Sequence, residues 1–172
     1  AAAAYADKAV VIISRSSGES EDVPDALFEL SDTETAMLQK VCDAFAGKPV
    51  IVILNSGNTI GCGFANGRVD GVYADAVLLA PCGGICGAQA LCDVLIGAVN
   101  PSGKTADTVA KALADYPSAD GFRNTWKIVY NEDIYVGYRY FETFDVAVDY
   151  EFGYGLSYTT FTLSDYTFAE AD

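Results

Sequence analysis

Three short, unbroken apolar runs constrain the fold of this chain more than any other feature. They cover Lys8 to Ser14, Pro49 to Asn55 and Asp75 to Ala80. Runs that are apolar on both faces are typical of parallel strands buried between layers of helices, whereas half-exposed strands alternate polar and apolar residues. The sequence therefore predicts a mainly parallel β-sheet that is flanked by helices.

Two helices are predicted beside these strands. Ser31 to Ala46 opens with a capping-box pattern, in which the Ser31 hydroxyl and the Glu34 carboxylate satisfy backbone N–H groups. The residues expected on its buried face are Met37, Val41, Ala44 and Phe45. A second helix is predicted over Ala88 to Ile96. This order of elements predicts an α/β fold with the layers of an α/β sandwich, as in flavodoxin-like domains.

Charge and composition exclude several classes of function. The 172 residues include 24 acidic and 10 basic side chains, and the net charge of −14 disfavours phosphate backbones and anionic lipid surfaces. No apolar run approaches the roughly eighteen residues that would indicate a membrane span. We therefore expect no nucleic-acid partner and no membrane partner, whereas a neutral substrate such as a sugar is compatible with this charge.

The chain contains no histidine, which excludes Ser-His-Asp and Cys-His catalysis within it. Acid–base chemistry would then fall to carboxylates, Tyr, Lys or Cys. Of the five cysteines, Cys82 and Cys86 have neither a CxxC spacing nor a partner pair, so we expect small buried residues there and no metal or disulfide site. No cofactor is indicated. The first residues lack the features of a signal peptide, which leaves the compartment open.

Functional side chains in a parallel sheet are expected in the loops that follow the carboxyl ends of the strands. Here these loops are Arg15 to Asp25, Asn55 to Gly67 and Pro81 to Gly87. The first loop is dense in carboxylates, which are Glu19, Glu21, Asp22 and Asp25. From the residues alone, any of these four could act as a general acid, or the loop could be an ordinary solvated acidic loop.

The second half of the chain follows a different pattern. Thr105 to Tyr116 fits either a helix or an extended stretch. From Trp126 onwards, glycines and aromatic residues replace aliphatic ones and predict extended segments and aromatic loops. We expect most of these rings to pack under the sheet, with their phenol groups bonded to the backbone.

Several stretches, in the right order along the chain, resemble one protein family. FGYGLSYTTF (Phe152 to Phe161), VIVILNSGNTI (Val50 to Ile60) and ALCDVLIGAVNPSGKTADT (Ala90 to Thr108) are similar to the C-terminal α/β sandwich domain of glycoside hydrolase family 3, the β-glucosidase family. The resemblance implies that residues 1–162 form part of this domain and that residues 163–172 lead out towards a following domain. It also implies that the sheet is truncated on its N-terminal side, because the family has strands before the one matching Lys8 to Ser14.

The resemblance also implies a site. Ser17-Gly18-Glu19 matches the family loop whose glutamate is the catalytic acid/base, so Glu19 would hold that role in cleaving a β-linked glucoside or small oligosaccharide. Ser17, Asn55 and Asn58 would bind the substrate. In the family the nucleophile is an aspartate on a (β/α)-barrel domain, which would be supplied in cis or in trans. Nothing in this chain resembles that barrel, so we expect the chain alone to be catalytically incomplete.

Two departures from the family pattern keep other functions open. The stretch GCGFANG (Gly61 to Gly67) lacks the usual tryptophan, and Cys82 to Gly87 replaces the family's Gly-Gln-Glu-x-Gly turn. These changes favour an alternative, a non-catalytic carbohydrate-binding or interaction domain of the same fold. A flavodoxin-like nucleotide or flavin binder is a further alternative, since the glycine-rich turn leads into a helix that could seat a phosphate.

Overall fold

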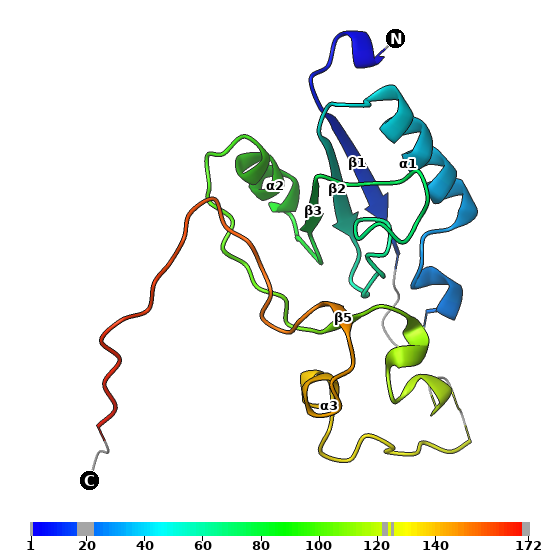
Figure 1. Cartoon of the computed structure of the whole chain (residues 1–172), viewed down its shortest axis with the longest axis vertical. Coiled ribbons are helices and arrows are strands. Elements are labelled where there is room, and N and C mark those ends of the chain that lie inside the picture. Colours follow the sequence, from blue (N-terminus) through cyan, green and yellow to red (C-terminus); the bar gives the residue numbers. More distant parts are fainter. Residues whose placement is uncertain (1, 17–22, 122–123, 125, 170–172) are drawn as a thin grey trace.

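The computed structural model describes residues 2–16, 23–121, 124 and 126–169. Its centre is a sheet of three parallel strands in the order β1-β2-β3, with β1 at Ala9–Ser14, β2 at Val50–Asn55 and β3 at Ala76–Leu79 (Figure 1). In register, Val11 of β1 lies opposite Val52 of β2, which lies opposite Val77 of β3. The predicted parallel sheet is confirmed.

Two helices flank this sheet on opposite sides, α1 (Asp32–Ala44) and α2 (Gly87–Leu95) (Figure 1). The capping box of α1 is formed as predicted: the Glu34 N–H donates to Ser31 Oγ at 3.3 Å, and the Ser31 N–H donates to Glu34 Oε2 at 2.9 Å. The predicted α/β architecture is therefore confirmed, including both helices.

The buried face of α1 differs from the prediction. Leu38 and Cys42 are its buried residues, whereas Met37 and Ala44 are exposed. Val41 and Phe45 pack against the core only in part. The apolar stripe of α1 is wide, and the sheet contacts it one position later than expected, so the predicted residues lie at its border.

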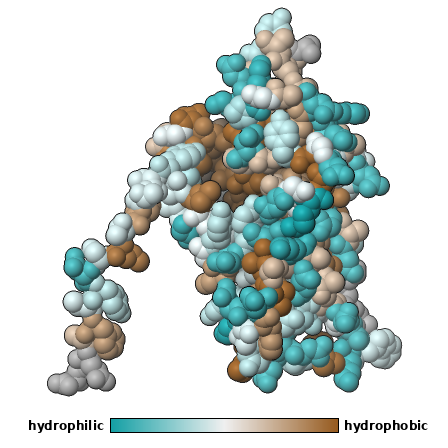
Figure 2. All heavy atoms as spheres, in the orientation of Figure 1, coloured by the Kyte–Doolittle hydropathy of each residue, from teal (hydrophilic) through white to brown (hydrophobic). Residues whose placement is uncertain are grey.

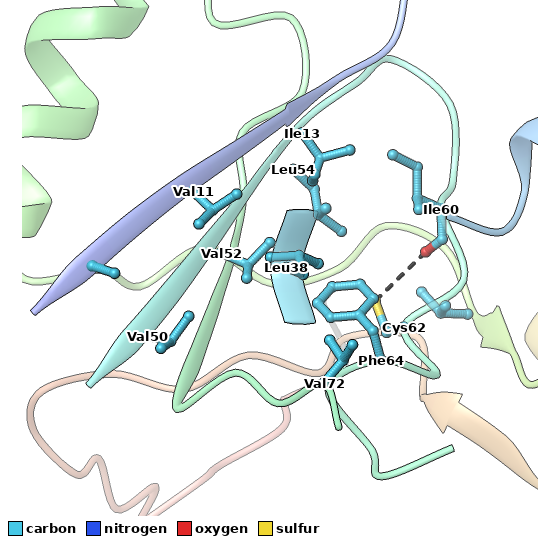
Figure 3. Packing of buried hydrophobic residues seen from close by; sticks show 12 residues of the cluster. Val11, Ile13, Leu38, Val50, Val52, Leu54, Ile60, Cys62, Phe64 and Val72 are labelled. Atoms are coloured by element: carbon cyan, nitrogen blue, oxygen red, sulfur yellow. Dashed lines mark hydrogen bonds between the residues drawn. The ribbon is translucent and has the colours of Figure 1, made fainter. Parts of the chain in front are cut away.

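Part of the loop after β2 is buried in the hydrophobic core, although the sequence predicted a functional loop there (Figure 3). Ile60, Cys62, Phe64 and Val72 of that loop pack with Leu38 of α1 and with the inward side chains of β1 and β2. Phe64 is only 1% exposed. This burial fixes the course of the chain directly after β2, because burying a large apolar side chain stabilises the fold by about 1.5–3 kcal/mol.

The opposite face of the sheet is covered unevenly. Ile53 of β2 is buried there, but Val10 and Ile12 of β1 are exposed. No residue of α2 is fully buried, and Figure 2 shows apolar side chains gathered around this helix and the strands beside it. Among the described residues, β1 has no partner on its outer edge, which agrees with the expected open side of the sheet.

The second half of the chain forms a smaller layer. β4 (Val109–Ala110) pairs antiparallel with β5 (Val148–Tyr150), so the ambiguous stretch Thr105 to Tyr116 is extended before it turns. The short 3₁₀ turns are η1 (Ala2–Ala4), η2 (Asp25–Leu27), η3 (Leu113–Asp115) and η4 (Ala119–Gly121). Val109 belongs to the main core, which joins the two layers.

The prediction of only extended segments and loops after Trp126 is wrong for one stretch. Tyr138–Thr143 is a short helix, α3, which follows Gly137 at φ 61°, a conformation that glycine adopts without strain. Phe141 is its one buried residue. The error has a simple cause. A helix of six residues with one buried side chain is too short to show the apolar periodicity by which helices are predicted.

The aromatic side chains also differ from expectation. Tyr138, Phe152 and Tyr154 are all more than 40% exposed and do not lie under the sheet. They pack against neighbouring rings instead: Tyr138 stacks on Phe152 with centroids 4.8 Å apart, and Tyr150 lies 4.9 Å from Tyr154. Their segment lies beyond the edge of the sheet, so ring-on-ring contact replaces burial there (Figure 1).

Two segments far apart in the sequence, Asn100 to Thr105 and Glu151 to Tyr158, are joined by hydrogen bonds, and we call this contact the clamp. The Thr105 N–H donates to the Tyr154 carbonyl at 2.8 Å, and the Tyr158 N–H donates to Asn100 Oδ1 at 2.8 Å. The Tyr158 hydroxyl donates to the Val94 carbonyl at the end of α2. The aromatic-glycine motif therefore has a structural role, since it ties the last segment to α2 and to the chain that follows it.

Beyond this clamp, residues 159–169 have no regular structure and lead away from the body of the domain (Figure 1). In the part of the chain that the structure describes, no helix combines the length and apolar character needed to cross a membrane.

We predict that Gly155→Ala destabilises the domain by about 1–3 kcal/mol, the usual range for overpacking. A Cβ at this position would collide with the Gly103 carbonyl oxygen inside the clamp. Gly87→Ala is the matched control, because a Cβ there meets nothing within 4 Å and residue 87 opens α2. Urea unfolding of the 172-residue chain measures both, and equal stability of the two variants would contradict the clamp.

Candidate functional site

The candidate site is a pocket of about 480 Å³ beyond the carboxyl ends of β1 and β2. Parallel pairing brings both strand ends to one edge, so the loops that follow them meet there. Among the described residues, the lining comes from residues 23–28 after β1, residues 57–59 after β2, the stretch from Asp107 to Ala119, and Gly137. The volume lies within the range of small-molecule sites.

Backbone and ring contacts hold these walls together. The Gly61 N–H donates to the Phe28 carbonyl at 2.7 Å, which joins the loops after β1 and β2. The Phe28 ring meets the Tyr116 ring edge-on, with centroids 6.1 Å apart. The Tyr116 hydroxyl donates to the Thr108 carbonyl at 2.9 Å and accepts from the Ala110 N–H at 3.1 Å. Burial raises the pKa of Tyr116, which keeps this phenol a neutral structural group.

Three polar side chains that line the same pocket have no hydrogen-bond partner among the described residues. The Asn58 amide and the Asp107 carboxylate make no hydrogen bond to any residue that the structure describes. Thr108 is only 6% exposed, and its Oγ1 is buried without a partner in the described part of the chain. A buried hydroxyl left in this state costs about 1–3 kcal/mol. The pocket therefore offers amide, carboxylate and hydroxyl groups beside aromatic and aliphatic walls.

The residues predicted from the sequence are placed differently. Asn58 lines the pocket, whereas Asn55 ends β2 and donates from Nδ2 to Ser14 Oγ at 3.3 Å. Ser17 and Glu19 lie outside the described residues, so their predicted roles stay predictions. Sequence reasoning missed Asp107 and Thr108 as pocket residues. They end the family-like stretch Ala90 to Thr108, but that likeness gave them no role, and they reach the pocket only through long-range packing.

A strong ion pair lies where the loop after β1 begins. Both guanidinium NH₂ groups of Arg15 donate to the Glu34 carboxylate, one of them at 2.7 Å. The Arg15 hydrogen bonds, opposed by partial burial and helped by Ser31, lower the pKa of Glu34 to about 2. The positive charge of Arg15 is therefore neutralised at the N-terminus of α1.

A second ion pair supports the loop after β2. Asp149 of β5 has a side chain only 1% exposed and accepts two hydrogen bonds from Arg68, one of them at 2.5 Å. Arg68 also donates to the Lys111 carbonyl. Burial alone would raise the pKa of Asp149, but hydrogen bonds from Arg68 and Asn66 outweigh it and leave the pKa below its usual value. The pair joins the loop to both strands of the small layer.

The five cysteines are free thiols in different surroundings. Cys62 is buried, and its desolvation raises the pKa of the thiol to about 12. Cys82, Cys86 and Cys92 are exposed, so the prediction of small buried residues is wrong for Cys82 and Cys86. The turn between them leads straight into α2, and the surface there is open. Within the described ranges, no three His, Cys, Asp or Glu side chains are grouped to hold a metal ion.

The fold defines the class of this protein as an α/β sandwich domain with a pocket at the carboxyl edge of its sheet. The family model for the glycosyl hydrolase family 3 C-terminal domain matches residues 1–158. The chain belongs to this family, as its sequence motifs indicated.

Individual relatives agree with this assignment. The chain is 43% identical to a beta-glucosidase of Ruminococcus albus over 95% of its own length and 17% of the relative, and 43% identical to beta-glucosidase A of Butyrivibrio fibrisolvens over 96% and 23%. The crystal structure of a beta-glucosidase from Paenibacillus barengoltzii matches 92% of the chain and 17% of that protein, with a TM-score of 0.85 and 41% identity. The chain thus spans less than a quarter of the length of these relatives.

We predict that Glu34→Gln lowers stability at neutral pH by about 2 kcal/mol, the typical value of a hydrogen bond to a charged group. Glu34 has a lowered pKa in the folded state, so its contribution is present above pH 4.5, its ordinary value, and is lost as pH falls towards about 2. The difference in unfolding free energy between wild type and variant should therefore shrink over that interval.

Glu142→Gln serves as the control for this experiment, since Glu142 is an exposed residue of α3. We expect its stability to stay within about 0.5 kcal/mol of wild type at each pH. Denaturant unfolding of the 172-residue chain between pH 2 and pH 7 measures the series. A difference for Glu34→Gln that does not change with pH would contradict the ion pair with Arg15.

Proposed function

We propose that this chain is the second domain of a retaining glycoside hydrolase of the β-glucosidase type, and that Glu19 is its general acid/base. The observation that carries the proposal is the family match over residues 1–158, which includes the Ser17-Gly18-Glu19 loop. The relatives that match most of the chain are named beta-glucosidases, which supports a terminal β-linked glucoside or small oligosaccharide as substrate. Residues 1–162 would form the domain and 163–172 would lead towards the next one.

The mechanism needs two carboxyl groups about 5–5.5 Å apart. Glu19 would donate its proton to the glycosidic oxygen while a carboxylate nucleophile attacks the anomeric carbon. Glu19, now ionised, would then take a proton from the water that releases the sugar. We assign the nucleophile to an aspartate on a barrel domain, in cis or in trans, because no segment of this chain resembles the family's nucleophile motif.

The surroundings of the Glu19 loop support an acid role. Arg15 lies four residues before Glu19, and Glu34 already neutralises its charge. A free cation beside a carboxylic acid would lower its pKa and release the proton too early. Val23, four residues after Glu19, lines the pocket. Ser17, Asn55 and Asn58 would bind substrate hydroxyls, and Asn58 already lines that pocket.

We predict that Glu19→Gln, made in the protein joined to its barrel domain, lowers hydrolysis of a β-glucoside with a poor leaving group by about 10²–10⁴-fold. With an activated dinitrophenyl glucoside the first step needs no acid, so added azide should restore turnover and yield the β-glucosyl azide. Steady-state kinetics and product analysis measure both effects.

Glu21→Gln is the matched control in the same loop and should keep its activity. Loss of activity in Glu21→Gln, with Glu19→Gln unaffected, would move the acid role to the neighbouring residue. Full turnover by the isolated 172-residue chain would refute a nucleophile on another domain.

One observation favours the second candidate, a non-catalytic carbohydrate-binding or interaction domain. In the stretch Gly61 to Gly67, which lacks the family tryptophan, the side chains of Cys62 and Phe64 are buried in the core. This stretch therefore presents no aromatic ring to the pocket. Sugar binding with no effect of Glu19→Gln on any hydrolysis would support this candidate over the enzymatic one.

A further inference from the structure

We propose that Asn66 is a modification site: its side-chain amide is lost by spontaneous deamidation, and the new carboxylate weakens the ion pair between Arg68 and Asp149. The inference is independent of the proposed function, since it involves neither the pocket nor the general acid. Asn66-Gly67 is the one Asn-Gly pair in the sequence. It lies in a tight turn of the loop after β2, which a hydrogen bond from the Arg68 N–H to the Gly63 carbonyl closes.

Deamidation needs a backbone nitrogen that can reach the asparagine side chain. The nitrogen of Gly67 attacks Cγ of Asn66 and loses its proton, the bond from Cγ to the amide nitrogen breaks, and ammonia leaves. Water then opens the resulting succinimide ring at either carbonyl, which gives aspartate or isoaspartate. The reaction consumes water and releases ammonia, without an oxidant or a reductant. Glycine is the most favourable residue after the asparagine, because it has no Cβ to hinder the close approach.

The peptide unit between Asn66 and Gly67 is the part of the turn that hydrogen bonds leave free. On one side of it, the Asn66 N–H donates to the Gly63 carbonyl at 3.2 Å, and on the other side the Arg68 N–H donates to the same carbonyl at 2.9 Å. The Asn66 carbonyl and the Gly67 N–H make no hydrogen bond to any residue that the structure describes. No such bond therefore opposes the rotation that brings the Gly67 nitrogen to Asn66 Cγ.

Space and solvent also favour the reaction. Asn66 and Gly67 are both exposed, so water reaches the ring that it has to open. Gly67 has a φ of 72°, and a Cβ at this position would meet nothing within 4 Å. The surroundings of the turn thus leave room for the succinimide.

Asn66 adjoins a buried carboxylate, which gives the modification its consequence. The side chain of Asp149 is only 1% exposed and accepts hydrogen bonds from Arg68. Burial would raise the pKa of Asp149, and hydrogen bonds from Arg68 and Asn66 lower it. Deamidation replaces the Asn66 donor with a second carboxylate, so that two negative charges compete for one guanidinium. Close carboxylates repel each other and disfavour the state in which both are ionised.

The isoaspartate product also alters the backbone. It adds a carbon atom to the main chain between Gly63 and Arg68, inside the turn that their hydrogen bond closes. This change would displace Arg68, which also donates to the Lys111 carbonyl. Both products would therefore weaken the contact between the loop after β2 and the layer of β4 and β5.

Peptide mapping by mass spectrometry tests the reaction on the folded 172-residue chain, incubated at mildly alkaline pH. We expect Asn66 to give separate aspartate and isoaspartate peptides over the period in which a synthetic peptide of residues 60–72 is converted. Asn131 is the internal control, since it is exposed but precedes the bulkier Glu132, and it should keep its amide. An Asn66 amide that survives in the folded chain after the peptide has reacted would overturn the proposal.

Urea unfolding tests the consequence. We expect the urea midpoint of the wild-type chain to fall as Asn66 is converted, and that of Asn66→Asp to be low without incubation. Asn66→Gln is the matched control: it keeps an amide but would have to close a larger ring, so its midpoint should be the same before and after incubation. Complete conversion of Asn66 with an unchanged midpoint would refute the effect on stability, and an equal fall in Asn66→Gln would place the cause elsewhere.

A double-mutant cycle tests the link to the ion pair. Asn66→Asp should lower the midpoint less in an Asp149→Asn background, because the buried carboxylate that it repels is then absent. An equal loss in both backgrounds would refute the ion pair as the target. If Asp149→Asn does not fold, NMR of the Arg68 side chain in Asn66→Asp decides, and unchanged guanidinium resonances would refute the link.

Discussion

The parallel pairing of β1, β2 and β3 is the constraint on which the rest of the structure depends. It places the carboxyl ends of the strands on one edge, so that Val23 and Asn58, 35 positions apart in the sequence, line one pocket. β2 lies between the other two strands, and Val52 and Ile53 are almost fully buried on its opposite faces. An antiparallel β2 would send its loop to the other edge, and the pocket would lose one wall.

The pocket needs a third wall, and long-range contacts supply it. Asp149 holds Arg68, Arg68 bonds to the Lys111 carbonyl, and β4 pairs with β5 beside them. These contacts carry Asp107 and Thr108 to the loops after β1 and β2. The family-defining motif around Gly155 acts from further away, since its clamp on Thr105 fixes the chain just before the wall begins. Its conspicuous sequence therefore reflects backbone packing, whereas the polar side chains of the pocket come from other stretches of the chain.

The features that could be predicted from the sequence are those that depend on a few neighbouring residues. Apolar runs located the strands, and the Ser31–Glu34 spacing located the start of α1, because caps and buried strands act over a few residues. It did not predict α3, which rests on one buried ring, or the exposure of Cys82, which follows from where its turn lies on the fold. Asp107 could not be predicted as a pocket residue for the same reason: its place is decided by the pairing of Val109 with Tyr150, 41 positions away.

The proposed division of the active site between two domains has a mechanical consequence. If this domain holds the acid and another holds the nucleophile, then the packing of the two domains sets the separation of about 5–5.5 Å between the carboxyl groups. A shift of about 1 Å at such an interface can cost 10²-fold in rate, even though it touches no reacting atom. The changed turn at Cys82 to Gly87 does not line the pocket. Under the proposed division of the site, a change at this exposed turn would act through domain packing and would leave the walls of the pocket unchanged.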